Sequence, residues 1–597
     1  MDAPQQRTPP IAFAKPSFAN ARWQMRPGWD GLSVAKDNGQ LSHLLHAGEG
    51  RIVKDGSHRT VYRFDTPHAA LYVKHYRCRG LLRRLRHFFR ASSARREWTK
   101  SLRLISLDIP TAAPVALGEV SSHGLVGDSF LVTRAIEPSL TLDEAMADGF
   151  LASGNPAAAR LQQQTTRHLA RLTAALHQAG VAPDDFHGGN VLVQLEGSEW
   201  DCGQAQQAAP DLRLHLIDVP GIHIGSGPLS WHKARANLVM LTSGFMNRTT
   251  SAQRWRFWRE YLRCRGAAWD AKTHSTWIYA AARSFARRLV RGRDARSLRD
   301  NRDFRAVVGN GWRAYTVRNL LPESVEQLAS RPIEILRRFQ HAPEKIAAGS
   351  LVIRADLPTE DGKIVVALKR LRPMRWLDRF VNTVLGQTVR SKAIRNWRVG
   401  HALLQRGIPT ARPICCLSTK SEEFLATEWL HGAENLHLFA WRIAELPTQE
   451  RDELAIRAAV ALGQTIGRLH WWRIRHRDLK GCNLLLTQTS STMCEGDEKE
   501  SPQSMRGCQV TASIVDLDGV RILRRLPYGA RVRDLARLAV SASAHRWIGA
   551  GVREAFLSAY IKASKPDRFD EPQLKRSVAT RAEKMVAHMR RQGKLIA

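Results

Sequence analysis

Cysteine is scarce in this sequence, and no cysteine has the spacing of a metal site. The eight cysteines are scattered over 597 residues, and only Cys415 and Cys416 are neighbours. Zinc sites need C-x-x-C pairs or clusters of cysteine and histidine, and the sequence has neither. This pattern excludes a zinc site of the usual spacing and favours a reducing compartment.

Long apolar runs are also lacking. No run approaches the ~20 apolar residues that a transmembrane helix needs. The segment 1–10 lacks the basic and apolar regions of a signal peptide. We therefore expect a cytoplasmic protein that is soluble or peripherally attached to a membrane.

Acidic residues are few relative to basic residues. The sequence has 55 Asp and Glu against 91 Lys and Arg, which gives a formal net charge of +36. A field of this sign attracts nucleic acid, an anionic membrane surface or a polyanionic substrate, and charge alone does not choose among them.

The chain contains two copies of one ordered pattern. A length of 597 residues favours two domains of about 250 to 300 residues over a single core. Four features recur in the same order at separations of 293 to 299 residues (369 − 74, 397 − 98, 478 − 185 and 516 − 218). These pairs are Lys74 and Lys369, Trp98 and Trp397, Asp185 and Asp478, and Asp218 and Asp516. The sequence therefore predicts two homologous halves.

Local patterns support this division. Leucines 169, 172 and 176 have the spacing of one helix face, as do Leu462, Ile466 and Leu469 in the second half. Alternation at 212, 214 and 216 predicts a strand that leads to Asp218. We expect domains at 30–297 and 331–597, with a linker at 298–330 because of its Gly-Asn-Gly and Leu-Pro-Glu breaks. The polar segment 490–504 is predicted to be a solvated loop.

The second half supplies the residue types that phosphoryl transfer needs. This chemistry requires a cation on the nucleotide phosphates, oxygen ligands for magnesium and a carboxylate facing the acceptor hydroxyl. Lys369 at the end of a strand can reach the phosphates, and Asp478 can orient or deprotonate the acceptor. Asn483 and Asp516 can hold the metal.

The stretch His-Arg-Asp-Leu-Lys-Gly-Cys-Asn at 476–483 resembles the catalytic loop of the protein-kinase-like fold. The resemblance covers both halves and implies an α+β chain of two tandem protein-kinase-like domains. Each would have a small β-rich N-lobe and a larger helical C-lobe. It implies ATP and Mg2+ as cofactors. In the first half the matching positions are Lys74 on the phosphates, Glu97 as its helix-borne partner, Asp185 as base, and Asn190 and Asp218 on magnesium.

Each half departs from that pattern. The first half has Pro183-Asp184-Asp185 in place of His-Arg-Asp, and its His187 resembles small-molecule kinases. The second half has Lys480 at that place, as Ser/Thr protein kinases do, which implies contact with the ATP phosphates. Its residue aligned with Glu97 is Asn396, so a Lys–Glu pair cannot form there. Neither half has a clear G-x-G-x-x-G loop, which weakens the reading as an ordinary protein kinase.

Flanking motifs indicate an acceptor. The first half has Tyr-Val-Lys74, Arg-Glu-Trp98 and Ile-Pro-Thr111, and the second has Asn-Trp397 and Gly-Ile-Pro-Thr410. These resemble the bacterial lipopolysaccharide core kinases, which phosphorylate Kdo or heptose sugars. The resemblance implies lipopolysaccharide core, an anionic glycolipid, as acceptor.

Basic segments at 74–100 and 369–398, with apolar residues between the charges, favour peripheral contact with the inner membrane on its cytoplasmic face. A solvated basic helix is the alternative for these segments. Nucleic acid is not expected, because no RNA- or DNA-binding module is present.

Two other functions stay open. A Ser/Thr protein kinase is favoured by the stretch from His476 to Lys480. A scaffold, in which one half and more readily the first binds nucleotide or its partner half without chemistry, belongs to a different class of protein.

Overall fold

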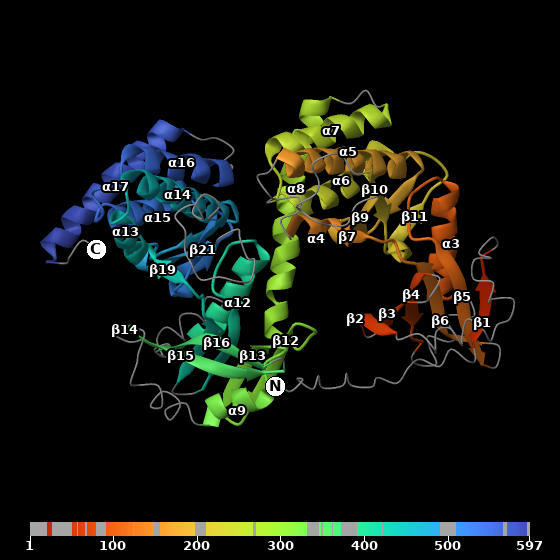
Figure 1. Cartoon of the computed structure of the whole chain (residues 1–597), viewed down its shortest axis with the longest axis horizontal. Coiled ribbons are helices and arrows are strands. Elements are labelled where there is room, and N and C mark those ends of the chain that lie inside the picture. The colour runs from red at the N-terminus through yellow and green to blue at the C-terminus, as the bar shows by residue number, and fades with distance from the viewer. Residues whose placement is uncertain are drawn as a thin grey trace, which may run out of the picture. The chain divides into compact units, whose positions relative to one another are not determined.

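The structure is a computed structural model that describes most of the chain. The described residues are 21–26, 50–56, 58–65, 69–78, 91–122, 125–147, 156–196, 211–246, 248–266, 270–330, 345–347, 350–360, 362–371, 391–419, 422–489, 509–564 and 570–593. The chain divides into two compact units, Met1–Ala286 and Arg287–Ala597 (Figure 1). Each unit is described by itself.

The first unit begins with an antiparallel six-stranded sheet in the order β1-β5-β6-β4-β3-β2. Its strands are β1 (Ala21–Met25), β2 (Arg51–Asp55), β3 (Arg59–Asp65), β4 (Ala70–Tyr76), β5 (Pro114–Ser122) and β6 (Leu125–Arg134). Burial alternates along β4, so that Leu71 and Val73 face the sheet core and Lys74 faces the opposite side. Helix α3 (Ser93–Ser106) lies on that opposite side and packs Ala94 and Trp98 against β5 and β6.

A helical part follows in the first unit (Figure 1). Its helices are α4 (Leu142–Ala147), α5 (Pro156–Gln178), α6 (Trp231–Phe245), α7 (Ser251–Arg265) and α8 (Ala271–Asp294), and the division between the units falls inside α8. Short strands lie among them: β7 (Ser139–Thr141), β8 (Val181–Pro183), β9 (Val191–Glu196), β10 (Asp211–Leu216) and β11 (Ile222–Ile224). The predicted helix at 169–176 lies within α5, and the predicted strand before Asp218 is β10. Their leucines are buried in one core with Phe186 and Phe245.

The second unit begins with a seven-stranded sheet in the order β12-β13-β17-β18-β16-β15-β14. Its strands are β12 (Phe304–Gly309), β13 (Trp312–Val317), β14 (Lys345–Ala347), β15 (Ser350–Thr359), β16 (Gly362–Leu371), β17 (Pro413–Ser418) and β18 (Glu423–Glu428). Helices α9 (Pro322–Ser330) and α12 (Lys392–Gln405) accompany the sheet, and both pack against β17. Trp397 of α12 is completely buried in this core.

The segment 298–330 is not a linker, in contrast to the sequence prediction. It forms β12, β13 and α9, and β13 pairs with β17 of the second unit's sheet. The Asn310-Gly311 pair connects β12 to β13 as a two-residue hairpin, and Gly311 has φ +82°. Such a turn needs left-handed backbone, which glycine adopts without steric cost. The glycines therefore mark a hairpin turn inside a domain.

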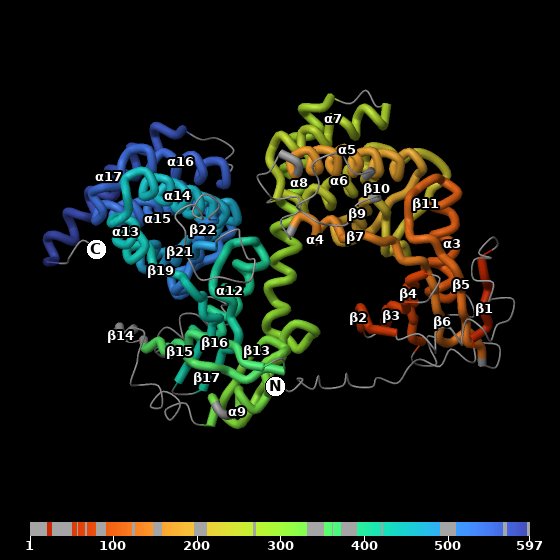
Figure 2. Tube along the Cα trace, in the orientation of Figure 1, coloured from red at the N-terminus to blue at the C-terminus, as the bar shows by residue number. Residues whose placement is uncertain are grey.

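The helical part of the second unit follows the same order as in the first (Figure 2). Its helices are α13 (Leu436–Ala444), α14 (Thr448–Trp471), α15 (Tyr528–Ala542), α16 (Ala550–Ser564) and α17 (Glu571–Arg591). Its strands are β19 (Ala433–Asn435), β20 (Ile474–His476), β21 (Leu484–Thr489), β22 (Gln509–Ile514) and β23 (Val520–Ile522). The predicted helix at 462–469 lies within α14. Both units therefore combine a sheet carrying the strand lysine with a helical part carrying the Asp–Asn loop.

Two predictions about surface segments fall largely outside the described residues. The loop at 490–504 lies outside them, as do residues 79–90 and 372–390 of the two basic segments. In the part of the chain that is described, no helix combines the length and the apolarity needed to cross a bilayer.

Candidate active site

A buried carboxylate holds the loop that carries Asp478. Asp534 of α15 is completely buried; its Oδ2 accepts a hydrogen bond from His476 N at 3.1 Å, and its Oδ1 pairs with Arg475 Nη2 at 2.9 Å. His476 is itself buried, and burial lowers the pKa of its imidazole despite neighbouring carboxylates. The backbone that delivers Asp478 is therefore anchored to α15.

The first unit has an amide at the corresponding place. Asn237 of α6 is buried, and its Nδ2 donates to the carbonyl oxygen of Pro183 at 2.7 Å. Neither Asn237 nor Asp534 was among the candidate residues. Both lie more than 50 residues from the loop they hold, and no local motif marks such a long-range contact.

The Asp and Asn of each loop are in contact. Asn483 Nδ2 donates to the Asp478 carbonyl oxygen at 2.8 Å and lies 3.2 Å from Asp478 Oδ2. In the first unit Asn190 Nδ2 donates to the Asp185 carbonyl oxygen, also at 2.8 Å. Because each amide nitrogen is engaged by the loop itself, Oδ1 is the atom of each asparagine that suits a cation.

The second aspartate of each set sits in the same backbone conformation. Asp218 has φ +62° and ψ +57°, and Asp516 has φ +58° and ψ +67°. Both are left-handed, which is uncommon for residues other than glycine, and each precedes a short 3-10 helix, η2 (Val219–Gly221) or η6 (Leu517–Gly519). Strained backbone of this kind persists where the surrounding structure determines it, which is frequent at functional sites.

In the first unit the strand lysine meets the helix acid. Lys74 Nζ lies 2.5 Å from Glu97 Oε1, and Glu97 is only 1% exposed. Tyr76 Oη donates a further hydrogen bond to the same carboxylate. Burial, together with Glu97, raises the pKa of Tyr76, which keeps the phenol protonated as a donor. The structure thus brings together the two residues that the sequence paired.

Arg59 is a functional candidate that sequence reasoning missed. Its Nη1 lies 2.8 Å from Asp218 Oδ1. Burial acts to raise the pKa of Asp218, but the hydrogen bond and charge of Arg59, with Lys74 and Lys54, lower it. Arg59, Asp185, Asn190 and Asp218 line one cavity of about 390 Å³. Arg59 belongs to no recognisable phosphate-loop motif, so nothing in the sequence singled it out.

In the second unit the strand lysine meets the second aspartate. Lys369 Nζ lies 2.6 Å from Asp516 Oδ1. Asn396, at the position that matches Glu97, is buried and donates through Nδ2 to Asp518 Oδ1 at 2.5 Å. The sequence expectation that no Lys–Glu pair forms at this position agrees with these contacts. Asp518 was not among the candidates.

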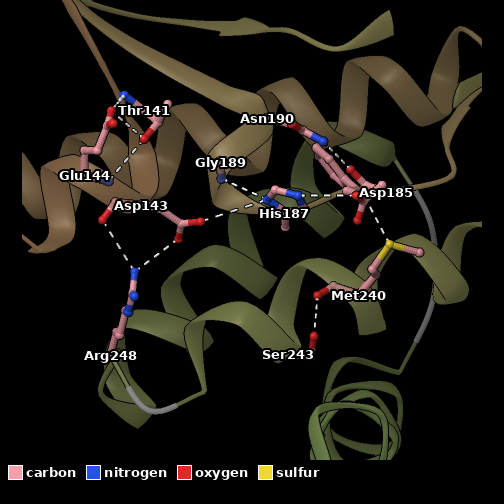
Figure 3. A network of polar contacts seen from close by, with 11 residues as sticks. Thr141, Asp143, Glu144, Asp185, His187, Gly189, Asn190, Met240, Ser243 and Arg248 are labelled. Atoms are coloured by element: carbon pink, nitrogen blue, oxygen red, sulfur yellow. Dashed lines mark hydrogen bonds and ion pairs between the residues drawn. The ribbon is translucent and has the colours of Figure 1, made fainter. Parts of the chain in front are cut away.

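The residue two places after the candidate base differs between the units. Lys480 Nζ lies 3.1 Å from Asp478 Oδ2; burial opposes its charge, but Asp478 raises the pKa of Lys480 overall. His187 lies between two carboxylates (Figure 3): its Nε2 is 3.4 Å from Asp185 Oδ2 and its Nδ1 is 3.9 Å from Asp143 Oδ2. Gly189 N donates to Nδ1 at 3.0 Å, so the neutral ring carries its proton on Nε2, toward Asp185.

The oxygen donors fit magnesium. Each unit offers one Asp carboxylate and one Asn amide oxygen, and magnesium is usually held by one or two carboxylates together with substrate phosphates and water. No group of three or more His, Cys, Asp or Glu suited to a metal occurs in the described ranges. One carboxylate and one amide oxygen in each unit leave the other positions of a magnesium ion for phosphate and water oxygens.

Comparison with known proteins gives a family match in both units. The model of the Lipopolysaccharide kinase (Kdo/WaaP) family matches residues 44–261 and 377–560. The lipopolysaccharide core heptose(I) kinase WaaP of Escherichia coli is 24% identical over 220 residues, which cover 36% of this chain and 78% of that protein. The protein of the same name from Pseudomonas aeruginosa is 25% identical over 179 residues, covering 29% and 63%.

One solved structure is also similar, that of WaaP in complex with acyl carrier protein. It aligns at 22% identity with a TM-score of 0.33, covering 44% of this chain and 98% of that chain. The two segments matched by the family model, one in each unit, fit a tandem arrangement.

Proposed function

Because the chain belongs to the Lipopolysaccharide kinase (Kdo/WaaP) family and is therefore a phosphotransferase, we propose that it transfers the γ-phosphate of ATP to a hydroxyl of a lipopolysaccharide inner-core sugar. The observation that carries this proposal is the repeated set of a strand lysine, a loop Asp–Asn pair and a left-handed Asp in both units. The WaaP relatives are named as core heptose(I) kinases, which supports the choice of acceptor.

The proposed architecture is two tandem protein-kinase-like domains, one in each unit. In each, the sheet would be the N-lobe and the helical part the C-lobe. With the boundary between Ala286 and Arg287, the hairpin of β12 and β13 belongs to the second domain. A catalytic cleft between lobes then follows from the contact of strand residues with the second Asp: Arg59 with Asp218, and Lys369 with Asp516.

We assign the same roles to both sets. Lys74 and Lys369 would neutralise the nucleotide phosphates, Glu97 would orient Lys74, and Lys480 would add a charge near the transferred group. Asn190 with Asp218, and Asn483 with Asp516, would hold magnesium. Magnesium, when bound, neutralises charge on the phosphates.

Asp185 and Asp478 would face the acceptor hydroxyl and take its proton. The position of each is fixed through its own backbone, since the following Asn holds its carbonyl oxygen. Lys480 Nζ, 3.1 Å from Asp478 Oδ2, puts a positive charge beside the candidate base. In the first unit His187 directs Nε2 toward Asp185, at 3.4 Å from Asp185 Oδ2.

The proposed place of action is the cytoplasmic face of the inner membrane, where a lipid-linked acceptor would be presented. The net charge of +36 supports contact with an anionic surface. A peripheral attachment is proposed because no described helix is suited to crossing a bilayer.

A Ser/Thr protein kinase is the second candidate. The contact of Lys480 with Asp478 favours it, since a lysine at this place is typical of protein kinases. Labelled γ-phosphate transfer from ATP and magnesium to purified inner-core lipopolysaccharide, with a generic protein acceptor in parallel, separates the two. We expect label on the glycolipid. Label on protein alone would replace the proposal by the second candidate.

A variant with Asp185→Asn and Asp478→Asn is the blank for this assay. It keeps the shape of both loops and removes both candidate bases. Nucleotide binding by the wild type without label on either acceptor would favour a scaffold, which should shift its melting temperature with ATP while transferring nothing.

A further inference from the structure

Helix α13 of the second unit lies directly against the loop that carries the candidate base. It contacts the short 3-10 helix η4 (Gly481–Asn483). A Cβ added at Gly481 would lie 2.5 Å from His437 Nε2, so the imidazole and this loop are in close contact. His437 on α13 therefore lies beside the loop that carries Asp478.

Two imidazoles and one indole gather on this face of α13, and we call them the His437–Trp441–His545 cluster. His437 Nδ1 and His545 Nε2 are 3.0 Å apart. The Trp441 ring meets the His545 ring at a steep angle, with centroids 5.7 Å apart. His545 is 3% exposed, whereas Trp441 is 59% exposed. The cluster thus combines a buried imidazole, that of His545, with an exposed aromatic ring, that of Trp441.

The charge of the cluster restricts what it can bind. Burial lowers the pKa of His437, and burial together with His437 lowers the pKa of His545. Both rings are therefore neutral at pH 7. A neutral aromatic surface does not attract anions, and it suits a ligand with a C–H face and hydroxyl groups.

The same place in the first unit is built from charges. Asp143, the second residue of α4, lies against Gly188: a Cβ added there would be 2.7 Å from Asp143 Oδ1. Arg248 Nη1 pairs with that carboxylate at 3.1 Å (Figure 3). Both loops keep the contact between their Asp and Asn, while the walls beside them differ in charge and in aromatic surface. A difference in this wall can alter which acceptor is bound without altering the contact between the Asp and the Asn of the loop.

We propose that the His437–Trp441–His545 cluster is an acceptor subsite of the second unit, in which Trp441 stacks on the C–H face of a sugar ring. The proposal rests on the proposed function, because the sugar is taken to be part of the acceptor. Trp441 is exposed on a helix that packs against the catalytic loop. Its indole therefore offers an apolar surface on which a sugar ring of the acceptor can stack. The imidazole pair holds the indole in place, since His545 contacts both His437 and Trp441.

Binding by full-length protein with Asp185→Asn and Asp478→Asn tests the subsite without turnover. The probe is inner-core oligosaccharide freed of its acyl chains. Titration calorimetry measures its affinity for the protein. Trp441→Ala should weaken binding roughly tenfold, the loss of about one aromatic contact, and Trp441→Phe should restore most of the affinity. Trp255→Ala is the matched control, because Trp255 is 40% exposed on α7 of the first unit. Equal affinity of Trp441→Ala and its parent, or no binding by the parent, would overturn the subsite.

Kinetics separate this proposal from the proposed function. In an Asp185→Asn background, Trp441→Ala should raise the KM for the oligosaccharide roughly tenfold, with kcat and the KM for ATP changed less than about twofold. Oligosaccharide binding that depends on Trp441 without any phosphate transfer would support the subsite and contradict the proposed function.

A lipid surface is the competing occupant. Leu438, which is 50% exposed on α13, would then enter the bilayer beside Trp441. Vesicles of phosphatidylglycerol and phosphatidylcholine provide the test by sedimentation. If Trp441→Ala and Leu438→Ala weaken vesicle binding alike and leave oligosaccharide binding unchanged, the face is a membrane contact and the subsite is wrong.

Discussion

The two units balance the charge of their strand lysine in different ways. Lys74 lies 2.5 Å from Glu97 of a helix, while Asp218 has a cation of its own in Arg59. Lys369 lies 2.6 Å from Asp516, because Asn396 stands where a helix acid would be. In the first unit the lysine is therefore oriented by Glu97 rather than by direct contact with the candidate metal ligand. In the second unit the lysine and that ligand are coupled, so a change in one alters the other.

The residues that anchor the two loops also differ in charge. The second unit uses a buried carboxylate, Asp534, and the first a buried amide, Asn237. A charged anchor that loses a partner leaves an uncompensated charge, whereas an amide leaves only an unpaired polar group. The second unit thus has the charged loop anchor, and the first unit has the lysine that pairs with a residue other than the candidate metal ligand.

The largest effect is expected from removing the charged anchor. Asp534→Ala should lower the free energy of unfolding of the second unit by about 3–5 kcal/mol, because Arg475 and the buried His476 N lose their partner. Asn237→Ala should cost the first unit about 1–3 kcal/mol. Calorimetry that separates two unfolding transitions measures both. Equal losses in the two transitions would contradict the distinction.

An intermediate effect is expected from the helix acid. In an Asp478→Asn background, Glu97→Gln should lower kcat/KM for ATP by roughly 10- to 100-fold, because Lys74 is no longer held in its working geometry. Asn396→Ala in an Asp185→Asn background is the control. It should change kcat/KM for ATP less than about threefold, since Lys369 makes its contact with Asp516. A similar loss in both variants would show that the helix position matters equally in the two units.

The third effect is a dependence of stability on pH. Burial lowers the pKa of His177 from 6.5 to about 3. Between these values the unfolded chain binds a proton that the folded chain does not. Stability therefore decreases as the pH falls from 6.5 toward 3, and His177 has no effect above 6.5.

Unfolding of His177→Gln at pH 4.5 and pH 7.5 measures this dependence. The substitution should reduce the difference in stability between these pH values for the first unit and leave that of the second unit unchanged. His470→Gln, at the matching place in α14, is the converse control, because burial also lowers the pKa of His470. If His177→Gln leaves the stability difference between pH 4.5 and pH 7.5 unchanged for the first unit, the lowered pKa of His177 is not its cause.

Sequence reasoning found what local motifs and periodicity encode. The Asp and Asn of each loop lie together at a spacing of five residues, and the alternation at 212–216 correctly predicts β10, the strand before Asp218. The resemblance to the lipopolysaccharide core kinases, drawn from the motifs around Lys74, Trp98 and Thr111, is confirmed by the family match. Glu97 was paired correctly with Lys74 through the resemblance rather than through any local signal.

Other parts of the sites depend on contacts that no local pattern records. Asp534 reaches its loop from 58 residues away, and Arg59 reaches Asp218 from 159. The linker prediction failed because Asn310-Gly311 is equally a loop signal and a hairpin turn, and only the pairing of β13 with β17 decides between them. The cluster around Trp441 likewise exists only once α13 packs against the loop.

Both units are proposed to carry a working phosphoryl-transfer site. The most direct measurement is the amount of labelled phosphate transferred from ATP to inner-core lipopolysaccharide by wild type, Asp185→Asn, Asp478→Asn and the double variant. A general base contributes about 10²- to 10⁴-fold, so each single variant should retain only the other unit's transfer, and the double variant should retain almost none. Full loss in one single variant and none in the other would leave one working site and contradict the account.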